Sequence, residues 1–233
     1  MNPEVVTIGL GYIGLPTSAL IASKGTYVLG VDINQKIVDT INQGNIHIVE
    51  PDLGQIVSKA VSKGFFKASI KPKSADVYLI VVPTPFKANH KPDISFIEAA
   101  TKEIIPLLKK GDLYIIESTS PIGTTEKMEK LIFTSRPELK GHIYIAYCPE
   151  RVLPGNVMYE LVENDRVIGG IDVVSTRKAI SFYSTYVNGD LYGTNARTAE
   201  MCKLVENSSR DVQIAFANEL SLICDKADIN AVS

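Results

Sequence analysis

Three glycines near the start of the sequence have the spacing of a turn that binds a diphosphate. Gly9, Gly11 and Gly14 form the pattern Gly-x-Gly-x-x-Gly directly after the apolar segment 4–8. In such a turn the first glycine permits a tight bend, the second lets the backbone approach a diphosphate, and the third lets a helix lie close to a strand. The N–H groups and the dipole at the start of that helix favour an anion.

An acidic residue follows the second predicted strand, at the position where the adenosine ribose of a dinucleotide would bind. A second apolar segment, 27–31, ends at Asp32, eighteen positions after Gly14. A carboxylate at the end of a second strand accepts hydrogen bonds from the ribose hydroxyls and repels a 2′-phosphate. These two features together predict NAD as the cofactor in preference to NADP. The structural alternative is a glycine-rich turn in which Asp32 only caps the next helix.

Two later threonines could face the same ligand. Thr84 stands between two prolines after the apolar run 76–82, and Thr119 lies in the Ser/Thr-rich segment 117–123 after the next predicted strand. Ligands of open α/β sheets bind outside the carboxyl ends of the strands, so both positions are candidate contacts. For Thr84 the alternative is a rigid turn without a ligand.

Polar residues also repeat at helical spacing near the end of the sequence. Lys203, Asn207 and Arg210 stand at i, i+4 and i+7, so they share one face of a helix. These side chains could bind oxygen atoms of a ligand, or they could form a solvated helix face. Their spacing alone leaves both interpretations open.

Predicted strands and helices alternate along the sequence as far as about residue 150, and they must position these residues. This alternation predicts a Rossmann-type, doubly wound, mostly parallel α/β sheet. Further strands are expected at 166–170 and 191–193, with a helix at 176–186 between them. The segment 197–227 has neither Gly nor Pro and carries apolar residues at helical spacing, so it predicts a helix of roughly 45 Å. We therefore divide the sequence into a nucleotide-binding domain, 1–193, and a long connecting or dimerising helix, 194–233.

Composition limits the class of protein. The sequence has 233 residues, of which 45% are hydrophobic and 21% charged, as in soluble globular proteins. A net charge of −2 gives no indication of a nucleic-acid or membrane-surface partner, and no apolar run approaches the length of a membrane span. The three cysteines lack the spacing of metal ligands, so no metal site is expected. Their odd number and scattered positions favour a reducing, cytoplasmic location.

Five segments follow one another in a characteristic order: 9–16 (Gly-Leu-Gly-Tyr-Ile-Gly-Leu-Pro), 82–85 (Val-Pro-Thr-Pro), 117–123 (Glu-Ser-Thr-Ser-Pro-Ile-Gly), 147–151 (Tyr-Cys-Pro-Glu-Arg) and 199–203 (Ala-Glu-Met-Cys-Lys) with Asn207. Together they resemble the UDP-glucose/GDP-mannose dehydrogenase family. The resemblance runs through essentially the whole sequence. Within the family, the sequence is most similar to members that oxidise UDP-N-acetyl-D-mannosamine. UDP-glucose and GDP-mannose are the alternative substrates.

The resemblance implies an NAD-dependent, four-electron oxidation of the C6 alcohol of a UDP-sugar to a carboxylate, through a thiohemiacetal and a thioester on a cysteine. It implies that Lys203 stabilises the oxyanion, that Asn207 helps to polarise it, and that Glu150 assists proton transfer. Thr119 would order water or contact the cofactor. The other implied contacts are Gly9, Gly11, Tyr12, Ile13, Gly14, Asp32 and Thr84 for NAD, and Arg151, Val152 and Arg210, with Lys203 and Asn207, for the sugar nucleotide.

The family's cysteine nucleophile lies in a Gly-Gly-His-Cys segment downstream of the long helix, and the sequence ends at Ser233 before any such segment. Cys148, Cys202 and Cys224 lie in other contexts, and we expect each to be a small buried apolar residue. The sequence therefore predicts a fragment that binds NAD but is inactive alone, within a homodimer formed through the long helix. The alternative is a natural, non-catalytic module that binds NAD or dimerises.

Overall fold

A single mixed sheet organises the computed structural model, which describes residues 3–153 and 155–230. Its strand order is β3-β2-β1-β4-β5-β6-β7-β8. The bounds are β1 Val5–Ile8, β2 Val28–Val31, β3 Phe66–Ser69, β4 Val77–Ile80, β5 Leu113–Ile116, β6 Tyr144–Tyr147, β7 Arg166–Gly170 and β8 Leu191–Asn195. The pairs from β3 to β6 and the pair β7–β8 are parallel, whereas β6 and β7 are antiparallel. The predicted Rossmann-type, mostly parallel sheet is confirmed.

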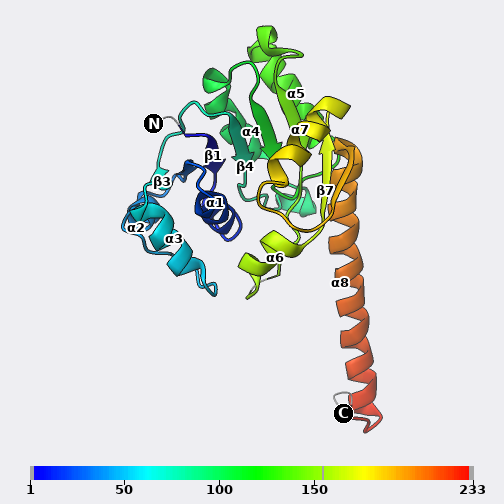
Figure 1. Ribbon diagram of the computed structural model, residues 1–233. Helices are drawn as coiled ribbons and strands as arrows, with labels where there is room; N and C mark the ends of the chain where they lie inside the picture. The colour runs from blue at the N-terminus through cyan, green and yellow to red at the C-terminus, as the bar shows by residue number, and fades with distance from the viewer. Residues whose placement is uncertain (1–2, 154, 231–233) are drawn as a thin grey trace.

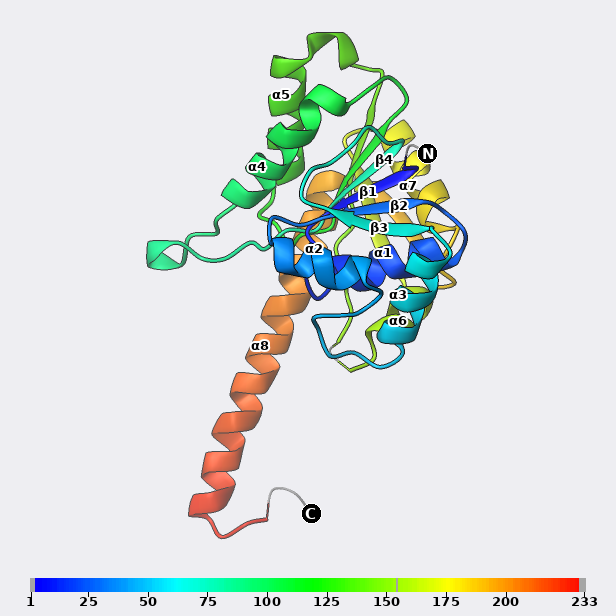
Figure 2. The ribbon, with the colours of Figure 1, turned by 90° about the vertical axis from the view of Figure 1, so that its left-hand side faces the viewer.

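Helices cover both faces of the sheet, as Figures 1 and 2 show. One core cluster packs side chains of α1, α2, α3, α6 and α7 on the sheet, and the other packs those of α4, α5 and the start of α8. Tyr78, Leu79 and Ile80 of β4 are completely buried, as expected for a central strand covered on both sides. The bounds are α1 Gly14–Ser23, α2 Gln35–Asn42, α3 Leu53–Ser62, α4 Ser95–Ile104, α5 Thr124–Ser135, α6 Val157–Glu163, α7 Val173–Tyr183 and α8 Ala196–Lys226.

Some local details differ from the sequence-based expectations. Helix α7 begins earlier than predicted because Asp172 caps it, accepting a hydrogen bond from the backbone N–H of Ser175. The spacing of apolar residues predicts one helix over 95–108, but α4 ends at Ile104 and the chain continues as a 3₁₀ turn, Ile105–Leu107. The seven-residue helix α6 was not predicted.

Helix α8 is anchored at its beginning. Among its 31 residues, those buried are Ala196, Ala199 and Glu200. The Glu200 carboxylate accepts hydrogen bonds from the backbone N–H groups of Gly123 (2.6 Å) and Thr125 (2.8 Å) and from the Thr125 hydroxyl (2.7 Å). These contacts at the start of α5 fix the first turn of α8, and with it the position of Lys203 one turn later.

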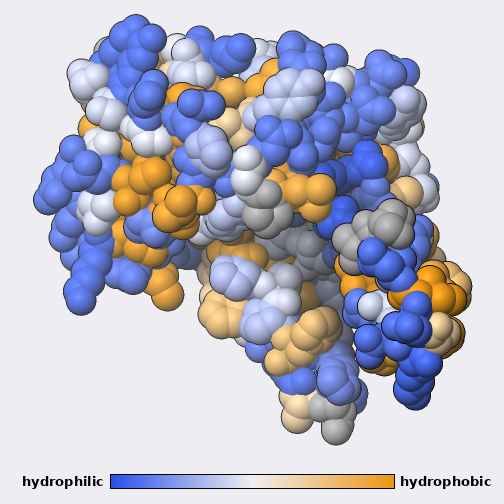
Figure 3. All heavy atoms as spheres, turned by 90° about the horizontal axis from the view of Figure 1, so that it is seen from below, coloured by the Kyte–Doolittle hydropathy of each residue, from blue (hydrophilic) through white to orange (hydrophobic). Residues whose placement is uncertain are grey.

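The rest of α8 projects from the domain (Figure 1). Apolar side chains on this part are exposed, among them Val205, Val212, Phe216, Leu220 and Ile223. The view from below shows hydrophobic side chains on the projecting helix among hydrophilic ones (Figure 3). Within the part of the chain that the structure describes, no helix combines the length and apolar character needed to cross a membrane.

Candidate functional site

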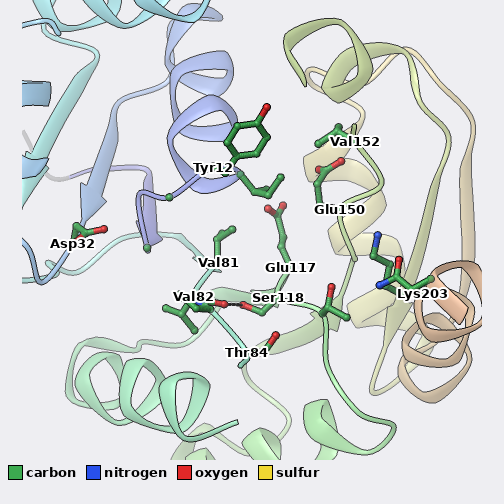
Figure 4. A pocket seen from close by; sticks show the side chains of 16 residues that line it. Tyr12, Asp32, Val81, Val82, Thr84, Glu117, Ser118, Glu150, Val152 and Lys203 are labelled. Carbon is green, nitrogen blue, oxygen red and sulfur yellow. Dashed lines mark hydrogen bonds between the residues drawn. The ribbon is translucent and has the colours of Figure 1, made fainter. Parts of the chain in front are cut away.

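A cavity of about 450 Å³ opens at the carboxyl ends of the central strands. Asp32 and Lys203 lie on opposite sides of it, with Tyr12, Glu117 and Glu150 between them (Figure 4). Eleven of the predicted site residues line it: Gly9, Gly11, Tyr12, Ile13, Asp32, Thr84, Thr119, Glu150, Val152, Lys203 and Asn207. The fold therefore brings together residues from the first and last parts of the chain.

The glycine turn follows β1 and leads into α1. Gly9 has a φ of +99°, and a Cβ built there would lie 2.4 Å from the carbonyl oxygen of Val81. A Cβ at Gly14 would lie 1.9 Å from the carbonyl oxygen of Gly9, so both positions exclude a side chain. Gly11 differs, because a Cβ there would meet no atom within 4 Å. The space over Gly11 is thus free for a ligand next to the backbone and to the start of α1.

Asp32 is held in place by two backbone N–H groups. Its carboxylate accepts hydrogen bonds from Leu10 (3.1 Å) and from Asn34 (2.9 Å). The residue that caps α2 is Asn34, whose side chain accepts a hydrogen bond from the N–H of Lys36, so Asp32 does not act as the helix cap. Asp32 also lines a neighbouring cavity of about 440 Å³ whose walls include Ile33, Ile37 and Phe96, a setting that suits a flat apolar ring.

A buried carboxylate that sequence reasoning missed connects the two sides of the main cavity. Glu50 accepts hydrogen bonds from the Tyr12 hydroxyl (2.5 Å) and from the backbone N–H groups of Gly155 (3.1 Å) and Val157 (2.7 Å). Burial alone would raise the pKa of Glu50, but the hydrogen bonds from Tyr12, Val157 and Gly155 outweigh it and lower the pKa. Glu50 therefore ties the glycine turn to the segment that leads into α6.

Behind the cavity lies a buried network of charged and aromatic groups. The Arg166 guanidinium lies 3.1 Å from the Glu150 carboxylate and 5.2 Å from the centre of the Tyr183 ring. Tyr183 in turn donates a hydrogen bond of 2.6 Å to Glu117. The resemblance implies that Glu150 assists proton transfer. In the structure its carboxylate is paired with the Arg166 guanidinium.

Helix α8 supplies the cationic side of the cavity. Lys203 is partly buried, and burial lowers the pKa of its ammonium group, although Glu206 and Glu150 oppose the shift. Asn207 lines the cavity one turn further along, whereas Arg210 is exposed and is not among the lining residues. Arg151 also lies outside it: its guanidinium forms an ion pair with Glu206 and lines a separate hollow beside α8.

Residues 3–187 match the NAD binding domain of the UDP-glucose/GDP-mannose dehydrogenase family, and residues 197–233 match its central domain. The chain belongs to this family. It is 57% identical over 234 residues to the UDP-N-acetyl-D-mannosamine dehydrogenase of Escherichia coli K12, with 97% of this chain and 56% of the relative covered. The NDP-N-acetyl-D-galactosaminuronic acid dehydrogenase of Ralstonia nicotianae is 54% identical, with 97% and 55% covered.

A solved structure extends this similarity to the fold. The UDP-N-acetyl-mannosamine dehydrogenase Cap5O of Staphylococcus aureus superimposes with a TM-score of 0.88 at 44% identity, over 97% of this chain and 56% of that one. The chain spans about half the length of the curated relatives it matches.

The cysteines of this family member do not reach the cavity. All three lie in the described part of the chain, and none is among the lining residues. Cys148 is fully buried, as expected, and burial raises the pKa of its thiol to about 12. Cys202 and Cys224 are only partly buried, contrary to expectation. Cys202 borders an open hollow beside α8, and Cys224 lies on the distal part of the helix, where Leu222 and Ile223 are exposed.

The structure adds lining residues that were not among the candidate contacts, although most of them lie in the motif segments 82–85 and 117–123. Glu117, Ser118, Val81, Val82 and Pro83 also line the cavity. The Ser118 hydroxyl donates a hydrogen bond of 2.7 Å to the carbonyl oxygen of Val82, which joins the ends of β4 and β5. Gly14 lies beneath the turn and is buried.

Proposed function

We propose that this chain is the NAD-binding half of a nucleotide-sugar dehydrogenase that oxidises the C6 alcohol of UDP-N-acetyl-D-mannosamine to a carboxylate. The supporting observation is the single cavity that has Gly11 and Asp32 on one side and Lys203 and Asn207 on the other. Two hydrides leave the substrate in this reaction, one at the alcohol stage and one at the aldehyde stage, and NAD accepts each of them.

The residues present fit NAD. The open backbone at Gly11, with Tyr12 and Ile13 at the start of α1, would take the diphosphate. Asp32 would take the adenosine ribose, and the adjoining apolar cavity would take the adenine. Thr84 and Thr119 would contact the other half of the cofactor.

The opposite side of the cavity would act on the sugar nucleotide. A partly buried ammonium at Lys203, aided by Asn207, would stabilise negative charge on the reacting oxygen better than an exposed one. We propose that Glu150 assists proton transfer, with Val152, Arg151 and Arg210 near the substrate.

The proposed reaction needs a cysteine thiolate as the nucleophile that attacks the aldehyde. We infer that this thiolate comes from outside this sequence, because the three cysteines lie away from the cavity. We also propose that the chain divides into a domain, 1–193, and the helix segment 194–233. We further propose a homodimer formed through the exposed apolar residues of α8. The boundaries of the two family matches support the division, and the spacing of the exposed apolar residues supports the dimer. Free cysteines fit a cytoplasmic protein.

Replacing Asp32 by alanine is expected to weaken NAD binding about tenfold, or ~1.4 kcal/mol, because the ribose hydroxyls lose a charged acceptor. Isothermal titration calorimetry with NAD measures the effect. Asp39→Ala, at an exposed position on α2, is the matched control and should bind like the unmodified chain. An unchanged affinity in Asp32→Ala would contradict the assigned ribose contact.

The substrate proposal is tested with two proteins, this chain and a version extended to the full length of its relatives. Each is incubated with NAD and UDP-N-acetyl-D-mannosamine, UDP-N-acetyl-D-galactosamine, UDP-glucose or GDP-mannose, and NADH is followed at its absorbance maximum. We expect turnover only by the extended protein, fastest with the mannosamine substrate. Turnover by the 233-residue chain alone would contradict the proposal, and preference for another sugar would correct the substrate.

A further inference from the structure

Glu117 is a buried acid on the wall of the cavity to which neither the motifs nor the proposed reaction gives a role. It follows β5 directly, is 2% exposed, and lines the cavity. Figure 4 shows its carboxyl group directed toward the space between Tyr12 and Glu150. One oxygen, Oε1, accepts the hydrogen bond from Tyr183, whereas the buried Oε2 has no partner within the described residues.

The position of Glu117 in the sheet places it on the redox side of the cofactor site. Strands lie in the order β2, β1, β4, β5, with Asp32 after β2, the glycine turn after β1 and Glu117 after β5. A dinucleotide with its ribose at Asp32 and its diphosphate at the glycine turn extends its second half across the ends of β4 and β5. That half carries the nicotinamide, which is a cation in NAD⁺ and neutral in NADH.

We propose that Glu117 sets the preference of this cavity for the oxidised cofactor, because its carboxyl group loses its proton when the cationic ring binds and keeps it when the neutral ring binds. The inference rests on the proposed mode of NAD binding. It assigns Glu117 a role in telling the two redox states apart, and not a role in the chemical step.

The surroundings of Glu117 bring the pKa of its carboxyl group close to neutral pH. Burial raises its pKa to about 7; Arg166 opposes this shift, Glu150 adds to it, and the hydrogen bond from Tyr183 opposes it. Cys148 and Tyr186 also interact with it, and burial keeps the pKa of each above its ordinary value. Tyr12 and Lys203 line the same cavity. The titration of Glu117 therefore falls in the physiological pH range.

The sign of the effect follows from linkage. A cation near the carboxyl group favours the charged form, lowers its pKa and releases the proton. If the bound cation lowers the pKa by about one unit, the affinity for NAD⁺ rises about tenfold relative to that for NADH as the pH increases through 7. Comparing the two redox states cancels the effect of the diphosphate, which both of them carry.

The test is calorimetric titration of this chain with NAD⁺ and, separately, with NADH. Each is measured from pH 5.5 to 8.5, and at pH 7 in two buffers that differ in ionisation enthalpy. We expect NAD⁺ to release a measurable fraction of a proton at pH 7 and NADH to release almost none. Glu117→Gln keeps an acceptor for Tyr183 and should make the affinity ratio independent of pH. Glu138→Gln removes an exposed acid paired with Arg136 and is the matched control.

Equal proton release by the two redox states would overturn the inference and leave NAD binding intact. So would a pH-dependent ratio that persists in Glu117→Gln. Absence of binding by either redox state would overturn the inference and the proposed function together. If Glu117→Gln does not fold, equal proton release by the two redox states in the unmodified chain would still overturn the inference.

Discussion

Replacing Gly11 by alanine is expected to remove most NAD binding and leave the stability of the fold unchanged. The new Cβ would meet no protein atom within 4 Å, so the folded chain accommodates it without strain. The same methyl group would occupy the space that a diphosphate needs to approach the backbone. We expect the affinity for NAD to fall about a hundredfold, or ~2.7 kcal/mol.

Calorimetric titration and thermal unfolding of the same sample separate these two effects. Gly54→Ala on α3, where the nearest atom to a new Cβ is 3.6 Å away, is a matched control that should retain affinity. Gly14→Ala should behave in the opposite way and lose stability, because its Cβ would lie 1.9 Å from the carbonyl oxygen of Gly9. Wild-type affinity in Gly11→Ala would show that the ligand does not pass over the glycine turn.

Replacing Arg166 by methionine is expected to lower the free energy of unfolding by about 3–5 kcal/mol, because it leaves a buried carboxylate without its cation. Glu150 and Arg166 are 8% and 3% exposed, and their charged groups lie 3.1 Å apart. The guanidinium also donates a hydrogen bond to the carbonyl oxygen of Leu161 and lies over the Tyr183 ring. Urea unfolding at pH 7 measures the loss.

Two further variants identify the cause of that loss. Arg177→Met, at an exposed position of α7, is the matched control and should change the free energy of unfolding by about 0.5 kcal/mol or less. The double variant Arg166→Met, Glu150→Gln should recover part of the stability, because it leaves no unpaired charge. A loss below about 1 kcal/mol in Arg166→Met would contradict an energetically important buried ion pair.

The parts of the site that the sequence could predict are those set by local chain geometry. The glycine turn and Asp32 follow directly from consecutive strand, turn and helix segments, so their spacing along the chain carries the information. The i, i+4 spacing of Lys203 and Asn207 likewise placed both on the face of α8 that lines the cavity. Arg210, one helical turn beyond Asn207, does not line the cavity and is exposed, like its neighbours Ser208 and Ser209.

The parts that the sequence could not predict depend on contacts between distant segments. The hydrogen bond from Tyr183 to Glu117 joins residues 66 positions apart, and the one from Gly155 to Glu50 joins residues 105 apart. No local pattern distinguishes such acids from solvated ones. The antiparallel pairing of β7 with β6 could not be predicted either, because the direction of a strand depends on the path of the segment before it.

A crystal structure of this chain grown with NAD would test the central claim most directly. The claim predicts the diphosphate against the backbone at Gly11 and the start of α1, the adenosine ribose on the carboxylate of Asp32, and the nicotinamide beside Thr84 and Glu117. A dinucleotide bound anywhere else on the chain, or a diphosphate displaced from the glycine turn, would contradict it.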